Sequence, residues 1–288
     1  MTVGVALLLL QSAGSADALR RTGEEADVFA QQASKLLATE TLRQRALKAP
    51  PRFRPRVVQE KFEPHYQARE IVSEYGFSAL HEAPDRLHEF RRVTAVDGRV
   101  VERAEKARET LTMGVKSDDD RLKKKLLRDF EKYGLQGAAT DFGQLILLFR
   151  GRSLGQFEFR RTGEQRLGAE TAAVYAFAQR EGPQALTIFE ERSALRQRLT
   201  GEIWVRQSDG VPLRIRLTTQ RKVDDRVLFD EADVDYTMSA HGFVVPASVV
   251  HRQYSGSLLV VENLFQYSAF KKFGAEAEIK FEAQEPPK

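Results

Sequence analysis

Apolar residues recur at helical spacing near the start of the chain. The pattern Thr22-Gly23-Glu24-Glu25 is typical of a capping box, in which a hydroxyl and a carboxylate satisfy the first free amides of a helix. Phe29, Ala33, Leu36 and Leu37 follow at spacings of three and four. These signals predict a helix over about residues 23–38. Residues 39–47 fit either a continuation of this helix or a first strand.

Proline interrupts the pattern after residue 49. Pro50, Pro51 and Pro55 exclude regular structure, and Arg52, Arg54 and Arg56 alternate with them. Residues 50–68 are therefore predicted to be an extended connection. A basic connection could contact acidic lipid headgroups or nucleic acid, but a solvated linker is the simpler interpretation.

The spacing changes to two from residue 69. Residues 71–76 and 88–96 alternate as strands do, and Asp97-Gly98 is a strong signal for a hairpin turn. Residues 104–149 form a central helical insertion. Within it, Asp118-Asp119-Asp120 can cap a helix that ends at Gly134 and carries Leu122, Leu126, Phe130 and Tyr133 on one face. A second short helix is expected over about 140–149. The three aspartates lack the spacing of a calcium loop, so capping is preferred.

Residues 155–281 read as consecutive strands separated by turns. Leu213-Arg214-Ile215-Arg216-Leu217 alternates most clearly, and Pro246 indicates an edge or a bulge within the strand 243–254. The connections are too short for helical crossovers, so the sheet must be antiparallel. The predicted fold class is α+β: a curved antiparallel sheet, an incomplete half-open β-barrel, with helices 23–38 and 119–149 covering its concave face. The remaining predicted strands are 156–160, 171–180, 186–188, 201–205, 227–238, 258–267 and 279–281.

The first eighteen residues are typical of a signal peptide. The apolar run Val3–Leu10 is followed by small residues, and Ala16-Asp17-Ala18 matches the A-x-A cleavage pattern, although Met1-Thr2 lacks a basic residue. The alternative is a buried strand or helix end. The expected organisation is a signal peptide (1–18), an N-terminal helix with a possible first strand (19–49), the connection (50–68), a half-barrel domain (69–281) and a C-terminal tail (282–288). The expected location is the periplasm, with no transmembrane span.

Composition narrows the function classes. Hydrophobic residues make up 42% and charged residues 30%, a globular balance, and the net charge of +4 is too small for a dedicated nucleic-acid binder. The absence of cysteine excludes disulfides, thiolate metal sites and a cysteine nucleophile.

No pattern in the sequence assigns catalytic residues, a metal site or a cofactor. There is no nucleophile elbow, phosphate-binding loop or pair of histidines at ligand spacing. His251 lies in a predicted strand, where a structural role is favoured. Glu231, Asp233 and Asp235 share one strand face and are expected to pair with Arg214, Arg216 or Arg221 on a solvated surface, with Asp230 beside them.

A curved sheet of this kind has a concave apolar surface. The same residues could form an ordinary filled core or line a cavity for a hydrophobic ligand. The candidate lining residues are Tyr175, Phe177, Ile203, Val205, Leu213, Ile215, Leu217, Tyr236 and Met238, together with Val234.

Two strand motifs carry a family resemblance. Gly201-Glu202-Ile203-Trp204-Val205, followed by Gly210-Val211-Pro212-Leu213-Arg214-Ile215, resembles a strand pair of lipoprotein carriers (LolA-like) and outer-membrane lipoprotein-sorting proteins. Val174-Tyr175-Ala176-Phe177 also resembles a strand of that family, and the order of elements resembles uncharacterised secreted bacterial proteins. The resemblance covers about residues 155–273. It implies an incomplete barrel with a helical lid that holds lipid acyl chains, and it implies no catalytic residues.

Three hypotheses follow for the function. The first is an exported periplasmic protein that binds a lipid or the acyl chain of a lipoprotein, with peripheral membrane contact possible and no nucleic-acid partner. The second is a cell-envelope interaction or structural protein without a ligand, and the third is a hydrolase with an unrecognised site. A concavity filled by bulky side chains favours the second hypothesis, whereas an open apolar groove favours the first. The oligomeric state does not follow from the sequence.

Overall fold

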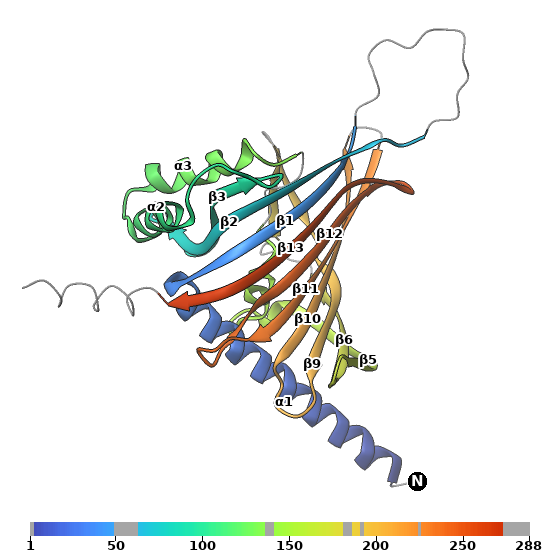
Figure 1. Cartoon of the computed structure of the whole chain (residues 1–288). Coiled ribbons are helices and arrows are strands. Elements are labelled where there is room, and N and C mark those ends of the chain that lie inside the picture. The colour runs from blue at the N-terminus through green and yellow to red at the C-terminus, as the bar shows by residue number, and fades with distance from the viewer. Residues whose placement is uncertain are drawn as a thin grey trace, which may run out of the picture.

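A single curved antiparallel sheet organises the chain (Figure 1). The computed structural model describes residues 3–48, 63–135, 141–180, 186–190, 193–223 and 226–272. The sheet has eleven strands in the order β4-β3-β2-β1-β13-β12-β11-β10-β9-β6-β5, and it does not close. The predicted α+β class is confirmed. The strands are β1 (Leu36–Leu47), β2 (Tyr66–Leu80), β3 (Ala83–Val96), β4 (Arg99–Val100), β5 (Phe157–Leu167), β6 (Glu170–Gln179), β9 (Thr200–Arg206), β10 (Pro212–Val223), β11 (Arg226–Met238), β12 (Val244–Ser255) and β13 (Leu258–Lys272), with β7 (Leu186–Glu190) and β8 (Ser193–Gln197) in a separate two-stranded sheet.

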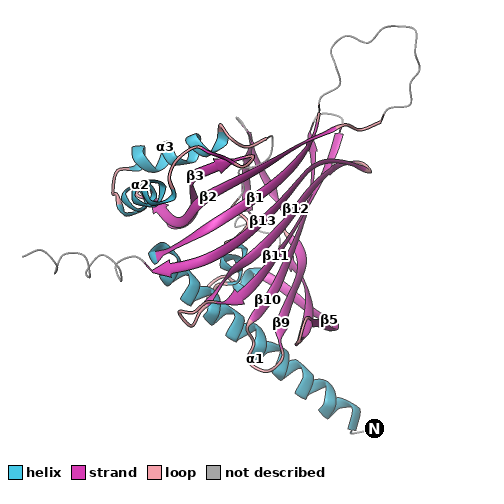
Figure 2. Cartoon of the chain, viewed as in Figure 1, coloured by secondary structure: helices cyan, strands magenta, loops and turns pink. Residues whose placement is uncertain are grey.

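The helices form two groups on the sheet (Figure 2). The long α1 lies along one side of the sheet, and α2 and α3 lie together near β2 and β3. Short 3-10 helices complete the set. The bounds are α1 (Val3–Gln32), η1 (Ala33–Lys35), α2 (Ala104–Lys116), α3 (Asp120–Glu131), η2 (Leu145–Phe149) and η3 (Leu154–Gln156).

The first strand joins the two halves of the sheet. β1 pairs with β2 on one side and with β13 on the other, so that Leu42 lies beside both Ile71 and Phe265. Residues 39–47 are therefore a strand, one of the two alternatives left open by the sequence. β2 begins at Tyr66, inside the predicted connection 50–68. Most of that connection, the expected strand 279–281 and the tail 282–288 lie outside the described residues.

The first helix is longer than the sequence pattern predicts. α1 already runs at Val3 and ends at Gln32, so the helix predicted from residue 23 begins too late. Thr22 is not its N-cap: its buried hydroxyl lies 3.1 Å from the Ala18 carbonyl oxygen and 3.0 Å from that of Gly210. A threonine hydroxyl can bond back to the preceding turn as well as cap a helix, which explains the wrong start.

The predicted cap of α3 is confirmed. The Asp119 carboxylate accepts a hydrogen bond of 2.9 Å from the Arg121 amide, and Leu126 and Phe130 are buried. Leu122 is 46% exposed, because the buried face of α3 is centred toward Lys123, whose ammonium donates to the Ala79 carbonyl. The second short helix, predicted over 140–149, is the 3-10 turn η2.

Turns and bulges follow the sequence signals. Asp97 and Gly98 both have positive φ, at 49° and 75°, as the predicted β3–β4 hairpin requires. Pro246 pairs with Tyr236 beside a shift in the β11–β12 register, which confirms the expected bulge.

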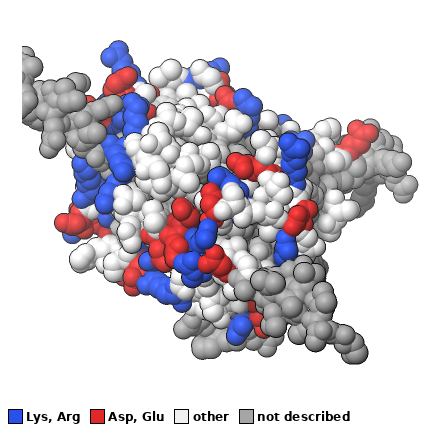
Figure 3. Space-filling model, turned by 90° about the horizontal axis from the view of Figure 1, so that it is seen from below, with Lys and Arg blue, Asp and Glu red and all other residues white. Residues whose placement is uncertain are grey.

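The outer face of β10 and β11 carries the predicted ion pairs. Arg214 pairs with Asp235 at 2.5 Å and Arg216 with Asp233 at 2.7 Å. The two guanidinium carbons lie 6.0 and 5.6 Å from the ring centroid of Trp204, which is only 4% exposed. Seen from below (Figure 3), cationic and anionic side chains are interspersed around a broad area of uncharged residues, and neither sign dominates.

Candidate functional site: the covered concave face

The predicted lining residues separate into two groups in the structure. Tyr175, Phe177, Ile203, Val205, Ile215, Leu217 and Tyr236 are all buried in one hydrophobic cluster, together with Val234. Leu213 packs instead against the cluster of Ala172, Val174 and Trp204, and Met238 is 42% exposed. Whether the first group receives a ligand remains a prediction.

A bulge accounts for the place of Leu213. The β9–β10 register shifts between Pro212 and Arg214, so strict alternation does not hold at that point. Val211 is buried in the main cluster, whereas Leu213 lies with Trp204. A β-bulge redirects the side chains before it, and the sequence gives no direct sign of one here.

The apolar half of the concave face is covered by α1 and η2. Ala26 and Phe29 of α1, Ala33 of η1, and Leu145, Ile146 and Phe149 of η2 are buried in the same cluster as the lining residues. The ring centroid of Phe149 lies 5.2 Å from that of Phe157, 5.7 Å from Phe159 and 4.9 Å from Phe177. Aromatic side chains of the cover and the sheet therefore interdigitate, and the concavity is filled.

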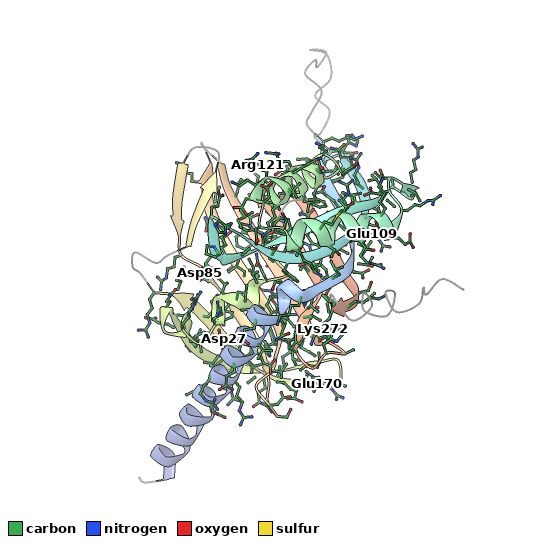
Figure 4. The ribbon with its side chains drawn as sticks, turned by 90° about the vertical axis from the view of Figure 1, so that its left-hand side faces the viewer. Asp27, Asp85, Glu109, Arg121, Glu170 and Lys272 are labelled. Atoms are coloured by element: carbon green, nitrogen blue, oxygen red, sulfur yellow. The ribbon has the colours of Figure 1, made fainter. Side chains whose placement is uncertain are left out.

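Polar contacts join the two parts of the cover. Asp27, which is labelled in Figure 4, accepts hydrogen bonds from Arg150 Nε at 2.7 Å and from the Gly151 amide at 3.1 Å. The backbone of η2 contacts the sheet through the Ile146 amide, which donates to the Tyr236 hydroxyl at 2.9 Å. Thr22 fixes α1 to the β9–β10 turn through Gly210. The cover is thus a unit held by few hydrogen bonds and by extensive apolar packing.

The other half of the concave face contains a buried ionic cluster. Arg91 donates to Glu40 at 2.8 and 3.0 Å and to Glu89 at 2.7 Å, and all three residues are buried. The guanidinium carbon of Arg91 also lies 5.1 Å from the Phe130 ring centroid and 5.3 Å from that of Tyr75. Buried charges require such pairing, because an unpaired ion in the interior is strongly unfavourable.

Glu89 connects this cluster to the chain segment that leads into η2. Its Oε1 accepts a hydrogen bond of 3.1 Å from the Gln144 amide. A Cβ atom on Gly143 would lie 2.8 Å from the Tyr75 hydroxyl and 3.0 Å from Glu89 Oε1, so the close approach requires glycine. Burial raises the pKa of Glu89 to about 8; Arg91 opposes this, while Asp141 and Glu40 add to it.

A second polar row lies beside the first. Gln44 donates to Asn263 at 2.7 Å, Asn263 contacts His251 Nδ1 at 3.1 Å, and His251 Nε2 contacts Asp230 at 3.1 Å. The Asn263 amide donates, so Nδ1 accepts and Nε2 carries the proton toward Asp230. Both ring nitrogens are engaged, and the Phe142 ring lies 4.6 Å from the imidazole. This arrangement gives His251 the structural role expected of it.

The described part of the chain offers no metal centre or membrane span. Among the residues that the structure describes, no group of three histidine, aspartate, glutamate or cysteine side chains could hold a metal ion. Within the same residues, no helix is both long and apolar enough to cross a membrane.

Sequence reasoning missed the ionic cluster. Glu89 and Arg91 alternate within the predicted strand 88–96, which places both on one face, but that face was not identified as the inner one. Opposite charges two residues apart, on the strand face that also carries the buried Val93, were the available signal. Glu40 lay in the segment whose structure the sequence left open.

No family model matches the sequence, and no curated protein is similar to it. The solved structures with a similar arrangement include a LolA superfamily protein from Nitrosomonas europaea (11% identity, 88% of this chain and 96% of the other, TM-score 0.32). They also include a putative outer-membrane lipoprotein-sorting protein domain from Vibrio parahaemolyticus (8% identity, 91% of this chain and 95% of the other, TM-score 0.34). A third is a DUF1329 family protein from Desulfovibrio piger (10% identity, 93% of this chain and 98% of the other, TM-score 0.34).

The resemblance expected from the strand motifs agrees with the first two of these names. At such identities and TM-scores the likeness says nothing about ligand or partner. The strand order, the registers and the covered concave face are the properties from which a function can be argued.

Proposed function

We propose that this protein is a non-enzymatic binding protein of the periplasm, which holds the acyl chain of a lipid or lipoprotein against its concave face. In the described state the segment Phe142–Phe149 occupies that place. Binding exchanges this segment for the acyl chain, while the sheet stays in place.

The observation that carries the proposal is that the exchanged segment is held mainly by apolar packing. η2 is one short 3-10 turn of five residues. At its start the Leu145 and Leu147 amides donate to the Phe142 and Gln144 carbonyls, and at its end the Arg150 amide donates to the Leu147 carbonyl at 3.5 Å. A 3-10 turn has poorer hydrogen-bond geometry than an α-helix. Most of its stabilisation therefore comes from buried apolar side chains, above all Phe149.

Apolar burial is not specific to one chemical group. An acyl chain gains about 0.8 kcal/mol per buried methylene group, so a long chain can replace the contacts of Leu145, Ile146 and Phe149. The aromatic surface of Phe157, Phe159 and Phe177 would stay buried in both states. The exchange then costs the hydrogen bonds of the Gln144 and Ile146 amides and that of the Gln144 side chain to the Leu87 carbonyl.

The filled concavity also favours a second function. A cover that never leaves would make the protein a cell-envelope interaction protein without a ligand, because its apolar concave face would be permanently occupied. The ion pair of Asp27 with Arg150 supports this alternative, since it holds α1 and η2 together.

Native mass spectrometry tests the two functions. The full chain is expressed with its leader, isolated from the periplasmic fraction and measured with solvent extraction of any co-purified molecule. A stoichiometric lipid or acylated species supports the binding function. A processed protein at its calculated mass that also takes up no added dodecyl amphiphile supports the interaction protein instead.

A further inference from the structure

The segment Phe142–Phe149 has a polar end and an apolar end. Phe142–Gln144 lies on the polar half of the concave face, against Glu89, Tyr75 and His251. Leu145–Phe149 lies on the apolar half. The segment is therefore amphiphilic along its length. The groups that contact its polar end indicate which polar group a ligand needs.

The polar end of the segment presents a hydrogen-bond donor to an acceptor. Glu89 Oε2 is already engaged by Arg91 at 2.7 Å, Oε1 accepts the Gln144 amide at 3.1 Å, and the Tyr75 hydroxyl is a further donor beside this carboxyl. Removing the segment takes the amide donor away and leaves the Tyr75 hydroxyl. A buried carboxylate is less stable with fewer donors, so a ligand that supplies one in place of the amide is favoured.

Above about pH 8, where Glu89 is ionised, the charge around this position is negative. Glu40 and Glu89 both contact the guanidinium of Arg91, and Asp141 adds a third carboxylate beside Glu89. Asp141 lies close enough that its Oδ1 is 3.4 Å from the Glu89 amide. An anionic headgroup placed here would face like charges in an environment of low dielectric constant, where repulsion is strong.

We propose that the ligand is an amphiphile whose polar end donates hydrogen bonds, such as an amine, an amide or a hydroxyl, and that Glu89 selects it against carboxylate and phosphate ends. This rests on the proposed binding function and names its ligand class. The donor takes the place of the Gln144 amide at Glu89 Oε1, and the tail takes the place of Leu145, Ile146 and Phe149.

Three dodecyl compounds of equal chain length test the selection. Dodecylamine, dodecanol and dodecanoate are titrated into the full chain below their micelle concentrations, at pH 9, where Glu89 is ionised. We expect dodecylamine and dodecanol to bind about tenfold more tightly than dodecanoate. The sequence pI is about 9.2, so the protein carries little net charge at pH 9 and general electrostatic attraction cannot produce this order.

A substitution assigns the selection to one carboxylate. In Glu89→Gln, the preference for dodecylamine over dodecanoate should fall toward equal affinity. Glu74→Gln is the matched control, because Glu74 is another buried glutamate in an arginine pair, with Arg108 at 3.0 Å, on the side of β2 that faces α2. The control should keep the wild-type preference.

The outcomes separate the ligand class from the function. Dodecanoate binding as tightly as dodecylamine to the wild-type protein overturns the selection by Glu89 and leaves the binding function standing. The same holds if Glu89→Gln keeps the full preference. If Glu89→Gln does not fold, the wild-type order alone decides. If none of the three compounds binds, the binding function fails, and the ligand class with it.

Discussion

The rings of Phe149 and Phe177 meet edge to face, with their centroids 4.9 Å apart and their planes at 76°. Phe149 belongs to the cover, whereas Phe177 lies on β6 and is one of the residues expected to line a cavity. Their contact shows that an aromatic side chain of the cover fills this part of the concave face. It also places Phe149 at the point where cover and ligand would compete.

Removing the Phe149 ring should create a ligand site at the expense of stability. We expect Phe149→Ala to lower the free energy of unfolding by about 3–5 kcal/mol, because the ring is fully buried among Phe157, Phe159 and Phe177. Dodecanol should fill the vacated space, so it should raise the urea midpoint of the variant more than that of the wild type.

Phe90→Ala is the control for that experiment. Phe90 is equally buried but packs with Leu111, Val115 and Leu126 of the α2–α3 pair. It should show a similar loss of stability without the gain from dodecanol. An equal gain in both variants would mean that dodecanol fills any cavity and does not compete with the cover.

The single tryptophan should report on the fold and not on the ligand. Trp204 packs with Ala172 and Val174 under Arg214 and Arg216, and its Nε1 donates to Gln165 at 2.7 Å. We expect Trp204→Ala to cost about 3–5 kcal/mol in urea unfolding. Amphiphile affinity should stay unchanged. An unaltered unfolding midpoint would contradict the burial of this side chain.

Much of this outer face was predictable because it follows local rules. Strand alternation paired Arg214 and Arg216 with the aspartates of β11, and Asp97-Gly98 fixed one hairpin. Leu213 was misplaced because a bulge cannot be seen in an alternating sequence. The long start of α1 was missed because Thr22 bonds to Gly210, which is 188 residues away.

Only the apolar half of the candidate site was predictable from the sequence, because only that half follows from local patterns. Its apolar half follows from alternation within β6, β9 and β10. Its polar half depends on β1 lying between β2 and β13, a pairing that no local pattern specifies. Only that pairing brings Glu40 beside Arg91 and Gln44 beside Asn263.

Breaking the ionic cluster at its cation should be severe. Arg91→Met leaves the buried Glu40 without its cationic partner and takes a hydrogen-bond donor from Glu89, so we expect a loss of about 3–5 kcal/mol in the free energy of unfolding at pH 7. Arg108→Met removes the partner of Glu74 at a more exposed position and should cost less. Comparable losses in the two variants would argue against the burial of the Arg91 cluster.

The stability of the protein should decrease as the pH rises from about 4.3 to about 8 and should change little from this group above that range. Because the pKa of Glu89 is raised to about 8, the native state holds a proton on this carboxyl that the unfolded chain releases near its ordinary pKa of about 4.3. The resulting contribution is complete below that lower value and is lost as the pH rises through 8. Urea unfolding between pH 5 and pH 9 should show this slope in the wild type. Glu89→Gln should flatten it, and an identical slope in the variant would assign the effect to other groups.

The central claim is that the segment Phe142–Phe149 leaves the concave face when a ligand binds. An engineered disulfide tests this claim most directly. A Cβ atom on Gly23 of α1 would lie 3.3 Å from the Cα atom of Gly151, just after η2. It would also lie 2.9 Å from the end of the Leu154 side chain, which must shift, and the chain has no other cysteine. In Gly23→Cys/Gly151→Cys, oxidation should link the end of the segment Phe142–Phe149 to α1, and reduction with dithiothreitol should release it. We expect the oxidised variant to lose binding of dodecanol, as measured by native mass spectrometry, and the reduced variant to regain it. Equal binding in both redox states would contradict an exchange of the cover for the ligand.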